Sequence, residues 1–397
     1  MRYSRIGRVI GAALVVPAFA AAAQQPQRIP LVEGLTIVTA VSQPEGDYES
    51  IKRIVSGSAK AVTLTYSADV PAPAAGGGLG SLLGGLTAGQ AEEEPSGRGE
   101  VRQIRSRRTI LREDLESARD YAQHFGEGHP ETLPGTTALG VSHAVLEDLK
   151  TKGSSLLSMR GAGPLGAAGA GVTRLLRGMA GEMAGGAHTS ELEALDRISG
   201  TVERLPGASK PFPVLLNGKP TSLPVVAARG TLDDQPVELT LLDDPDNPLA
   251  LVWKISDLGS LRVVRIDLVD TARMAGGIER QLGESGRAVV YGIYFDFASA
   301  VIKPESEPVL AEIASALRTH ADWNLAIEGH TDAIGDSRSN LALSEQRAAA
   351  VRSALVERYQ VTGERLSPRG FGESRPKATN LTLEGRAENR RVELVRR

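Results

Sequence analysis

The sequence predicts an α+β protein, in which a β-rich N-terminal α+β domain with disordered insertions precedes a smaller C-terminal domain of the order βαβαββ. The length of 397 residues exceeds one ordinary domain. Hydrophobic residues make up 41% of the chain and charged residues 23%, which is typical of a folded protein with a core. Strand-like runs dominate up to residue 272, whereas strands and helical spacing alternate after residue 285.

Four parts follow from these patterns. We expect a signal peptide at 1–23, a β-rich α+β domain of unknown role at 24–272, a linker at 273–284 and the C-terminal domain at 285–397.

The first 23 residues have the composition of a secretory signal. A basic start precedes an apolar stretch at 9–19, and three alanines stand before Gln24. An uncleaved membrane anchor is the alternative, but it would need about 20 unbroken apolar residues, and Pro17 interrupts the shorter run. We therefore expect an exported, periplasmic protein that begins near Gln24. An association with the outer membrane stays open.

Composition excludes several kinds of site. The formal net charge of -3 gives no general attraction for nucleic acid. The chain has no cysteine, which excludes disulfides, thiolate metal sites and cysteine nucleophiles. The six histidines do not cluster, so we expect neither a metal ion nor any other cofactor.

The N-terminal domain is read mainly as strands. Asn217-Gly218 lies between two apolar runs and predicts a hairpin. Gly-, Ala- and Pro-rich composition predicts flexible insertions at 71–99 and 160–188. The other predicted elements are strands at 35–41, 61–66, 101–112, 136–141, 237–242, 249–254 and 261–268, and helices at 113–125 and 142–152.

Two charged stretches of this domain allow two interpretations each. Five arginines between Arg102 and Arg112 suggest either a nucleic-acid patch or a solvated strand face, and the second is favoured. The acidic segment 243–247 suggests either a calcium loop or a polar turn. Its spacing matches no calcium-loop rule, so the turn is favoured.

The C-terminal domain alternates strands with amphipathic helices. Strands are predicted at 291–297, 325–328, 366–371 and 391–395. Pro304 suits a helix start, and Asn340 is expected to cap the next helix. The first of these helices has an apolar stripe made of Val309, Leu310, Ile313, Ala314 and Leu317.

A set of motifs runs through this domain in a fixed order. They are Phe295-Asp296-Phe297, Gly329-His330-Thr331-Asp332 with Gly335, Asn340 with Leu343-Ser344 and Arg347-Ala348, Gly370, Asn380, Gly385-Arg386-Ala387, and Asn389-Arg390-Arg391-Val392. These residues resemble the OmpA-like peptidoglycan-binding domain shared by OmpA, Pal and MotB, over about 285–397. The resemblance implies a non-catalytic domain that binds peptidoglycan stem peptides at diaminopimelate.

The resemblance implies that Asp332 and Arg347 recognise the ligand. The free end of diaminopimelate carries an ammonium and a carboxylate. Asp332 can accept hydrogen bonds from the ammonium, and Arg347 can hold the carboxylate with two donors. The alternatives are that Asp332 only braces its loop and that Arg347 only pairs with Glu345 or Asp336.

Other positions complete the predicted site. The resemblance implies contacts from Phe297, Ala298, Thr331, Gly335, Asn340 and Leu343, with Arg390 as a secondary basic position that pairs within the domain. Ala298 and Val301 depart from the family, where polar residues are frequent, so that loop is expected to offer backbone contacts. His330 is interpreted as structural.

The function predicted is therefore a non-catalytic, periplasmic cell-wall-binding protein. One alternative is a wall-acting enzyme in 24–272 that the C-terminal domain targets, although that part shows no nucleophile elbow, zinc-histidine motif or phosphate loop. Another is an envelope scaffold whose 24–272 part docks an outer-membrane or secretion partner. Oligomers would gain avidity for a polymeric wall.

Overall fold

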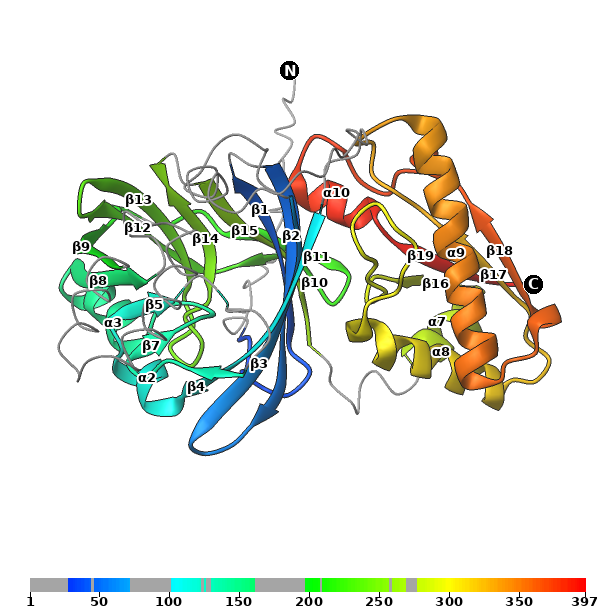
Figure 1. Ribbon diagram of the computed structural model, residues 1–397, viewed down its shortest axis with the longest axis horizontal. Helices are drawn as coiled ribbons and strands as arrows, with labels where there is room; N and C mark the ends of the chain where they lie inside the picture. The colour runs from blue at the N-terminus through cyan, green and yellow to red at the C-terminus, as the bar shows by residue number, and fades with distance from the viewer. Residues whose placement is uncertain are drawn as a thin grey trace, which may run out of the picture.

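The computed structural model describes residues 28–43, 46–71, 101–122, 125, 130–160, 197–207, 209–256, 259–268 and 277–397. The predicted signal peptide and almost all of the two predicted insertions lie outside these residues. Figure 1 shows two units side by side, a β-rich N-terminal unit and a C-terminal unit in which helices cover a smaller sheet. The α+β class is thus confirmed.

All the strands described in the N-terminal unit belong to one sheet, which curves around its own core (Figure 1). Its order is β6-β4-β3-β2-β1-β15-β14-β13-β12-β9-β8-β5-β7, and a hairpin of β10 and β11 joins it at β15. The bounds are β1 (Thr36–Gln43), β2 (Gly46–Gly57), β3 (Ala61–Pro71), β4 (Val101–Leu111), β5 (Asp120–Ala122), β6 (Glu131–Thr132), β7 (Thr136–Thr137), β8 (Ser154–Arg160), β9 (Arg197–Arg204), β10 (Phe212–Leu216), β11 (Lys219–Leu223), β12 (Val225–Leu232), β13 (Gln235–Leu242), β14 (Ala250–Ile255) and β15 (Gly259–Asp267).

Alternating side chains of these strands form the core of the unit. Val62 and Leu64 of β3 are fully buried, and they pack in one cluster with Ile37 of β1. A second cluster surrounds Trp253, whose ring stacks on Tyr121 at 4.8 Å. Helix α3 (His143–Thr151), capped by Ser142, packs three apolar residues into that second cluster.

Several strand predictions in this unit are confirmed. The hairpin turn occurs at Asn217 and Gly218, whose φ angles of 48° and 72° suit a tight two-residue turn. Strands occur near the positions expected at 35–41, 61–66, 101–112, 237–242, 249–254 and 261–268.

Two predictions in this unit are wrong, and several strands were missed. The helix expected at 113–125 ends early, because α2 spans Arg112–Ser117 and the next residues form β5. Tyr121 of β5 is buried beside β8, so tertiary packing overrides the helical pattern. The strand expected at 136–141 is only two residues long. The missed strands are β2, β5, β6, β8, β9 and β12.

The structure shows what the two charged stretches, 102–112 and 243–247, form. Arg105 and Arg107 are exposed on β4, whereas Arg108 is buried, bonded to Glu131 and placed 4.1 Å from the Phe125 ring. The 243–247 segment is a polar turn. Asp244 accepts a hydrogen bond from the Ile29 backbone N–H, and Asn247 donates to the Ile29 carbonyl.

The C-terminal unit is a four-stranded sheet of order β16-β19-β17-β18, in which only β17 and β18 are parallel. Helices α7, α8 and α9 pack against its apolar side, where the predicted stripe from Val309 to Leu317 is buried. The elements are α7 (Gly277–Ser285), β16 (Arg287–Val290), η2 (Pro304–Ser306), α8 (Glu307–Thr319), β17 (Leu325–Gly329), α9 (Ser337–Tyr359), η3 (Gly363–Arg365), β18 (Leu366–Gly370), α10 (Leu383–Asn389) and β19 (Val392–Arg396).

Four details of this unit differ from the sequence prediction. The first strand is 287–290 rather than 291–297, because the latter segment leaves the sheet and makes only an isolated bridge, Phe295 to Ile302. Asn340 lies inside α9, which Asp336 caps by accepting from the Ser339 N–H. An extra helix, α10, stands before the last strand. Residues 277–285, within the expected linker, form α7, which buries Ile278 and Leu282 in the C-terminal core.

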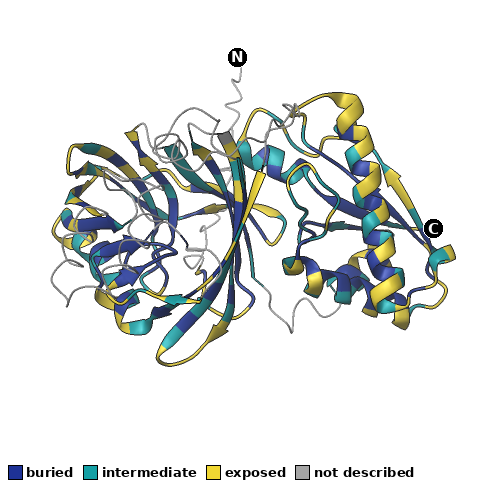
Figure 2. Cartoon of the chain, in the orientation of Figure 1, coloured by how far each residue is buried: buried dark blue, intermediate teal, exposed yellow. Residues whose placement is uncertain are grey.

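The two units meet along β1, β2, β3, β10 and β15 on one side and α10 and the 291–305 segment on the other (Figure 1). Val38, Val264 and Ala387 form a small buried apolar cluster there. Arg262 pairs with Glu384 at 2.5 Å. Figure 2 shows buried residues at this seam, whereas the outward face of α9 is exposed. Among the described helices, none combines the length and apolar character that crossing a bilayer requires.

Candidate functional site

The predicted acid and base lie on neighbouring elements. Strand β17 ends at Gly329, the 330–336 loop carries Asp332, and α9 carries Arg347 in its third turn. Gly329 packs directly on α9, where a Cβ would lie 2.3 Å from the Ser344 carbonyl oxygen. This close approach brings the loop and the helix together, and only glycine permits it.

The 330–336 loop is held in one shape by its own polar groups. Asp332 Oδ1 accepts a hydrogen bond from the Ile334 N–H at 3.1 Å. Asn340 Nδ2 donates to the carbonyls of Asp332 and Ile334, and to Glu373 Oε2 at 2.7 Å. Gly335 has φ 94°, a left-handed conformation that favours glycine. Asn340 therefore braces the loop rather than capping α9.

Asp332 is engaged by a second partner, Arg390. Arg390 Nη1 lies 2.5 Å from Asp332 Oδ2, and the Asp332 side chain is 13% exposed. The expectation that Arg390 pairs within the domain thus describes one of its two contacts. The loop-bracing alternative for Asp332 also describes a real contact, through Oδ1, so this carboxylate is a shared acceptor at the edge of solvent.

Arg347 is oriented but only partly satisfied. Its Nε donates to the Ser299 carbonyl at 3.0 Å, and its guanidinium lies 4.9 Å from the Phe295 ring centroid. Neither Nη atom donates a hydrogen bond to the described residues, and Arg347 forms no ion pair with them, so the alternative pairing with Glu345 or Asp336 does not occur. The half-buried guanidinium keeps a two-donor edge available.

The charge environment of Arg347 favours an incoming anion. Burial lowers the pKa of Arg347 to about 10, and the neighbouring Arg390 lowers it as well, while Asp332 and Glu49 act in the opposite direction. A bound carboxylate would relieve both unfavourable effects, since it supplies the missing counter-charge.

The 295–303 loop borders the same region. Phe297 is 58% exposed, and Ala298 adopts a positive φ of 48°. The Phe297 N–H donates to Asp69 of β3 at 2.7 Å, and Lys303 Nζ joins Asp69 to Asp296. The backbone contact expected from Phe297 is therefore already made to the N-terminal unit.

The remaining predicted positions lie around this centre in different ways. Thr331 is buried, with its N–H bonded to the Gly372 carbonyl and its hydroxyl without a hydrogen-bond partner among the described residues. Leu343 is half-buried on α9, one turn before Arg347. Sequence reasoning missed Glu49 of β2, which bonds to Arg390, and Asp69. No local pattern in the N-terminal unit marks either acid.

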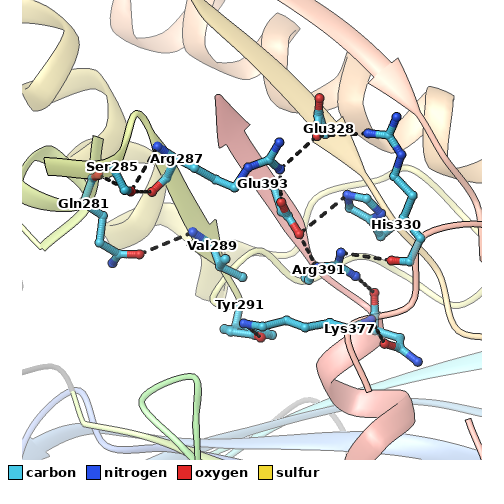
Figure 3. Close-up of polar contacts among 12 residues, drawn as sticks. Gln281, Ser285, Arg287, Val289, Tyr291, Glu328, His330, Lys377, Arg391 and Glu393 are labelled. Carbon is cyan, nitrogen blue, oxygen red and sulfur yellow. Dashed lines mark hydrogen bonds and ion pairs between the residues drawn. The ribbon is translucent and has the colours of Figure 1, made fainter. Parts of the chain in front are cut away.

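A second charged cluster lies on the polar face of the small sheet (Figure 3). Glu328, His330 and Glu393 approach one another within 4.8 Å, the one such group with metal-binding spacing in the described part of the chain. Arg391 Nε lies 2.6 Å from Glu393, however, and Arg287 bridges Glu393 and Glu328. Guanidinium groups already supply the positive charge, so these carboxylates suit ion pairs rather than a metal ion.

His330 behaves as a structural residue in that cluster. Its ring stacks on Phe371 with centroids 5.5 Å apart. Burial lowers the pKa of His330 to about 4, and the nearby Arg391 contributes in the same direction. The imidazole is therefore neutral at physiological pH.

Comparison with known proteins identifies the C-terminal unit. Residues 294–390 match the model of the OmpA family. Outer membrane porin F of Pseudomonas aeruginosa is 45% identical over 101 residues, which are 25% of this chain and 29% of the porin. The C-terminal domain is thus an OmpA-family domain, and this match spans less than a third of the length of that relative.

Solved structures match the same part of the chain. The peptidoglycan-associated lipoprotein from Burkholderia pseudomallei is 34% identical, with 26% of this chain and 88% of that one covered and a TM-score of 0.25. The cell wall anchor of the T6SS from Pseudomonas aeruginosa is 32% identical, with 31% and 94% covered and a TM-score of 0.25.

Proposed function

We propose that this chain is a non-catalytic, periplasmic cell-wall-binding protein that holds peptidoglycan stem peptides at diaminopimelate through its C-terminal domain. The observation that carries this proposal is the free edge of Arg347. Its Nε is bound to the Ser299 carbonyl, so the guanidinium is oriented, while both Nη atoms remain available. A planar two-donor edge matches a carboxylate.

The ammonium of the same ligand head has its acceptor in Asp332. Each carboxylate oxygen can accept two hydrogen bonds. Oδ1 receives one from Ile334 and Oδ2 one from Arg390, which leaves acceptor capacity on both atoms. The sharing lowers the affinity expected from this acid, yet the two contacts hold its carboxylate in one orientation.

The surroundings of this polar centre suit the stem of a peptide. Phe297 and Ile334, each a few residues from a polar contact of the site, are 58% and 65% exposed. Apolar rims around a few convergent polar groups are usual at ligand sites. The family resemblance of the surrounding motifs supports a wall ligand in particular, and the OmpA-family match at 294–390 agrees with it.

The test is binding of the full chain to purified sacculi and to a soluble muropeptide that ends in diaminopimelate. We expect Asp332→Ala and Arg347→Ala each to remove most binding without unfolding the domain, because each removes one charge-assisted contact of roughly 1.5–3 kcal/mol. Circular dichroism and a denaturant titration verify that both variants fold.

Arg358→Ala is the matched control. Arg358 lies in the last turn of the same helix, is 53% exposed and pairs only with the exposed Glu307. It is 11 residues from Arg347, or about 16 Å along the helix. This variant removes the same charge and should bind as the wild type does. Undiminished binding by both site variants would refute the site.

A further inference from the structure

The N-terminal unit reaches the Asp332 side of the candidate site through Glu49, whereas Asp69 contacts the bordering 295–303 loop. Arg390 bonds to Asp332 through Nη1 and to Glu49 through Nη2, so a single guanidinium bridges the two domains. The side chains of Glu49, Arg390 and Asp332 are 38%, 29% and 13% exposed. All three can therefore be reached from solvent, and the bridge borders the site rather than sealing it.

The charges of the C-terminal domain are unbalanced without Glu49. Without Glu49, Asp332 would be the acid that faces both Arg347 and Arg390, and both Nη groups of Arg390 could turn to that one carboxylate. Burial disfavours the charge of Arg390, but Glu49 and then Asp332 outweigh burial and raise its pKa. The charge of Glu49 thus helps to keep Arg390 protonated, together with the charge and the hydrogen bond of Asp332.

A zwitterionic ligand needs both signs of charge in the site. A site with two arginines and one acid has a net positive charge, which attracts the carboxylate of the ligand and repels its ammonium. With Glu49 present, two arginines face two acids. Glu49 also draws one edge of Arg390 away from Asp332, which leaves Asp332 acceptor capacity for an ammonium.

The position of Glu49 is fixed by the rest of the domain contact. Asp69, on the adjacent strand β3, is buried, accepts from the Phe297 N–H and lies 2.9 Å from Lys303 Nζ. Tyr294 donates to Asp267 at 3.1 Å, next to the apolar cluster of Val38, Val264 and Ala387. Contacts on both sides of Glu49 hold β2 against the site, so the acid is preorganised.

From this geometry we infer that Glu49 is a specificity-determining residue of a site shared by both domains: it engages Arg390 so that the site accepts the ammonium end of a zwitterionic stem-peptide residue. This inference rests on the proposed function. It goes beyond it by assigning a binding role to the N-terminal domain and by naming the ligand group that this role controls.

The experiment uses the full chain and two ligands. One is a muropeptide that ends in diaminopimelate with a free amino group, and the other is the same muropeptide with that amino group acetylated. Titration calorimetry gives the affinity of each. We expect the wild type to prefer the free amine, and Glu49→Gln to lose about tenfold in affinity for it while binding the acetylated ligand unchanged.

Arg53→Ala is the control for a purely structural effect. Arg53 is on the same strand as Glu49 and donates across the domain contact to the Glu305 carbonyl at 3.0 Å, without touching Arg390. This variant should keep the preference for the free amine. If Glu49→Gln lowers the affinity for both ligands equally, or retains the wild-type preference for the free amine, the inference is overturned and the proposed function stands. If the wild type binds neither ligand, both fall.

Discussion

Two clusters of arginines and carboxylates lie in the same small domain, and they differ in how far their partners satisfy them. On the sheet face, Glu393 is paired with Arg287 and Arg391, and Glu328 is paired as well. Near α9, one nitrogen of Arg347 is bonded and the other two have no hydrogen-bond partner among the described residues, and Asp332 is shared. The first cluster stabilises the fold, whereas the second can stabilise a ligand. Hydrogen-bond donors that have no partner among the described residues, rather than charge itself, distinguish the candidate site from the sheet-face cluster.

The largest expected effect is on the free energy of unfolding, and it comes from a substitution in the sheet-face cluster. Glu393→Ala leaves Arg391, 5% exposed, without its main counter-charge, and such losses cost about 3 kcal/mol. We expect a fall of that size in the free energy of unfolding, measured by denaturant titration, with sacculus binding retained by the folded fraction. Arg358→Ala, at an exposed pair, should cost under about 1 kcal/mol. Equal costs for the two variants would contradict the contrast.

The next effect is a dependence of stability on pH in the acid range, which the sheet-face cluster predicts through His330. The pKa of His330 is about 4 in the fold and 6.5 ordinarily, so the unfolded chain takes up the proton first as pH falls. The contribution of neutral His330 to the free energy of unfolding is fully present above pH 6.5 and is lost between pH 6.5 and pH 4. We expect a loss of the free energy of unfolding on the order of 2 kcal/mol over that window. His330→Gln should remove this part of the slope. An unchanged slope would show that His330 titrates normally.

A subtler change separates charge from geometry in the site. Arg347→Lys keeps the positive charge but loses the planar two-donor edge and the Nε bond to Ser299. We expect about a tenfold loss of affinity for the muropeptide and little change in the free energy of unfolding, measured by calorimetry and denaturant titration. Wild-type affinity in this variant would mean that a point charge suffices.

The smallest expected effect compares two glycines with open space around them. Gly335 of the site loop has φ 94°, whereas Gly283 lies within α7 with no positive φ. Gly335→Ala should cost about 1 kcal/mol through backbone strain, and Gly283→Ala should gain a few tenths or more through helix propensity. Thermal unfolding of both variants gives the comparison. If both substitutions stabilise the protein, the site loop does not need the left-handed conformation at Gly335.

Local patterns were sufficient for much of the C-terminal domain. The apolar stripe from Val309 to Leu317 is buried as predicted, since helical spacing alone defines its inward face. The strand expected at 291–297 was wrong. The alternating sequence of this segment is equally compatible with a loop, and here its backbone N–H groups bond to the side chains of Ser306 and Asp69. Asn340 failed as a cap, because Asp336 stands at the position where the helix begins.

The N-terminal unit was predicted less completely for a related reason. Strands with strong turn signals were found, whereas β8 and β9 were not, because their sequences mix Ser, Gly and Arg with few apolar residues. These strands owe their conformation to pairing with each other and with β5 and β12. Such non-local pairing leaves little trace in a short window of sequence.

The sequence by itself determined the α+β class and the amphipathic helices of the C-terminal domain, because periodicity is a local property. The family resemblance predicted Asp332 and Arg347 as ligand contacts. Only the tertiary structure decided which charges those two residues meet. Glu49 and Arg390 are 341 positions apart, and Asp69 and Lys303 are 234 apart. Pairs this distant are set by how two separately folded units pack, since no spacing rule connects residues across a domain contact.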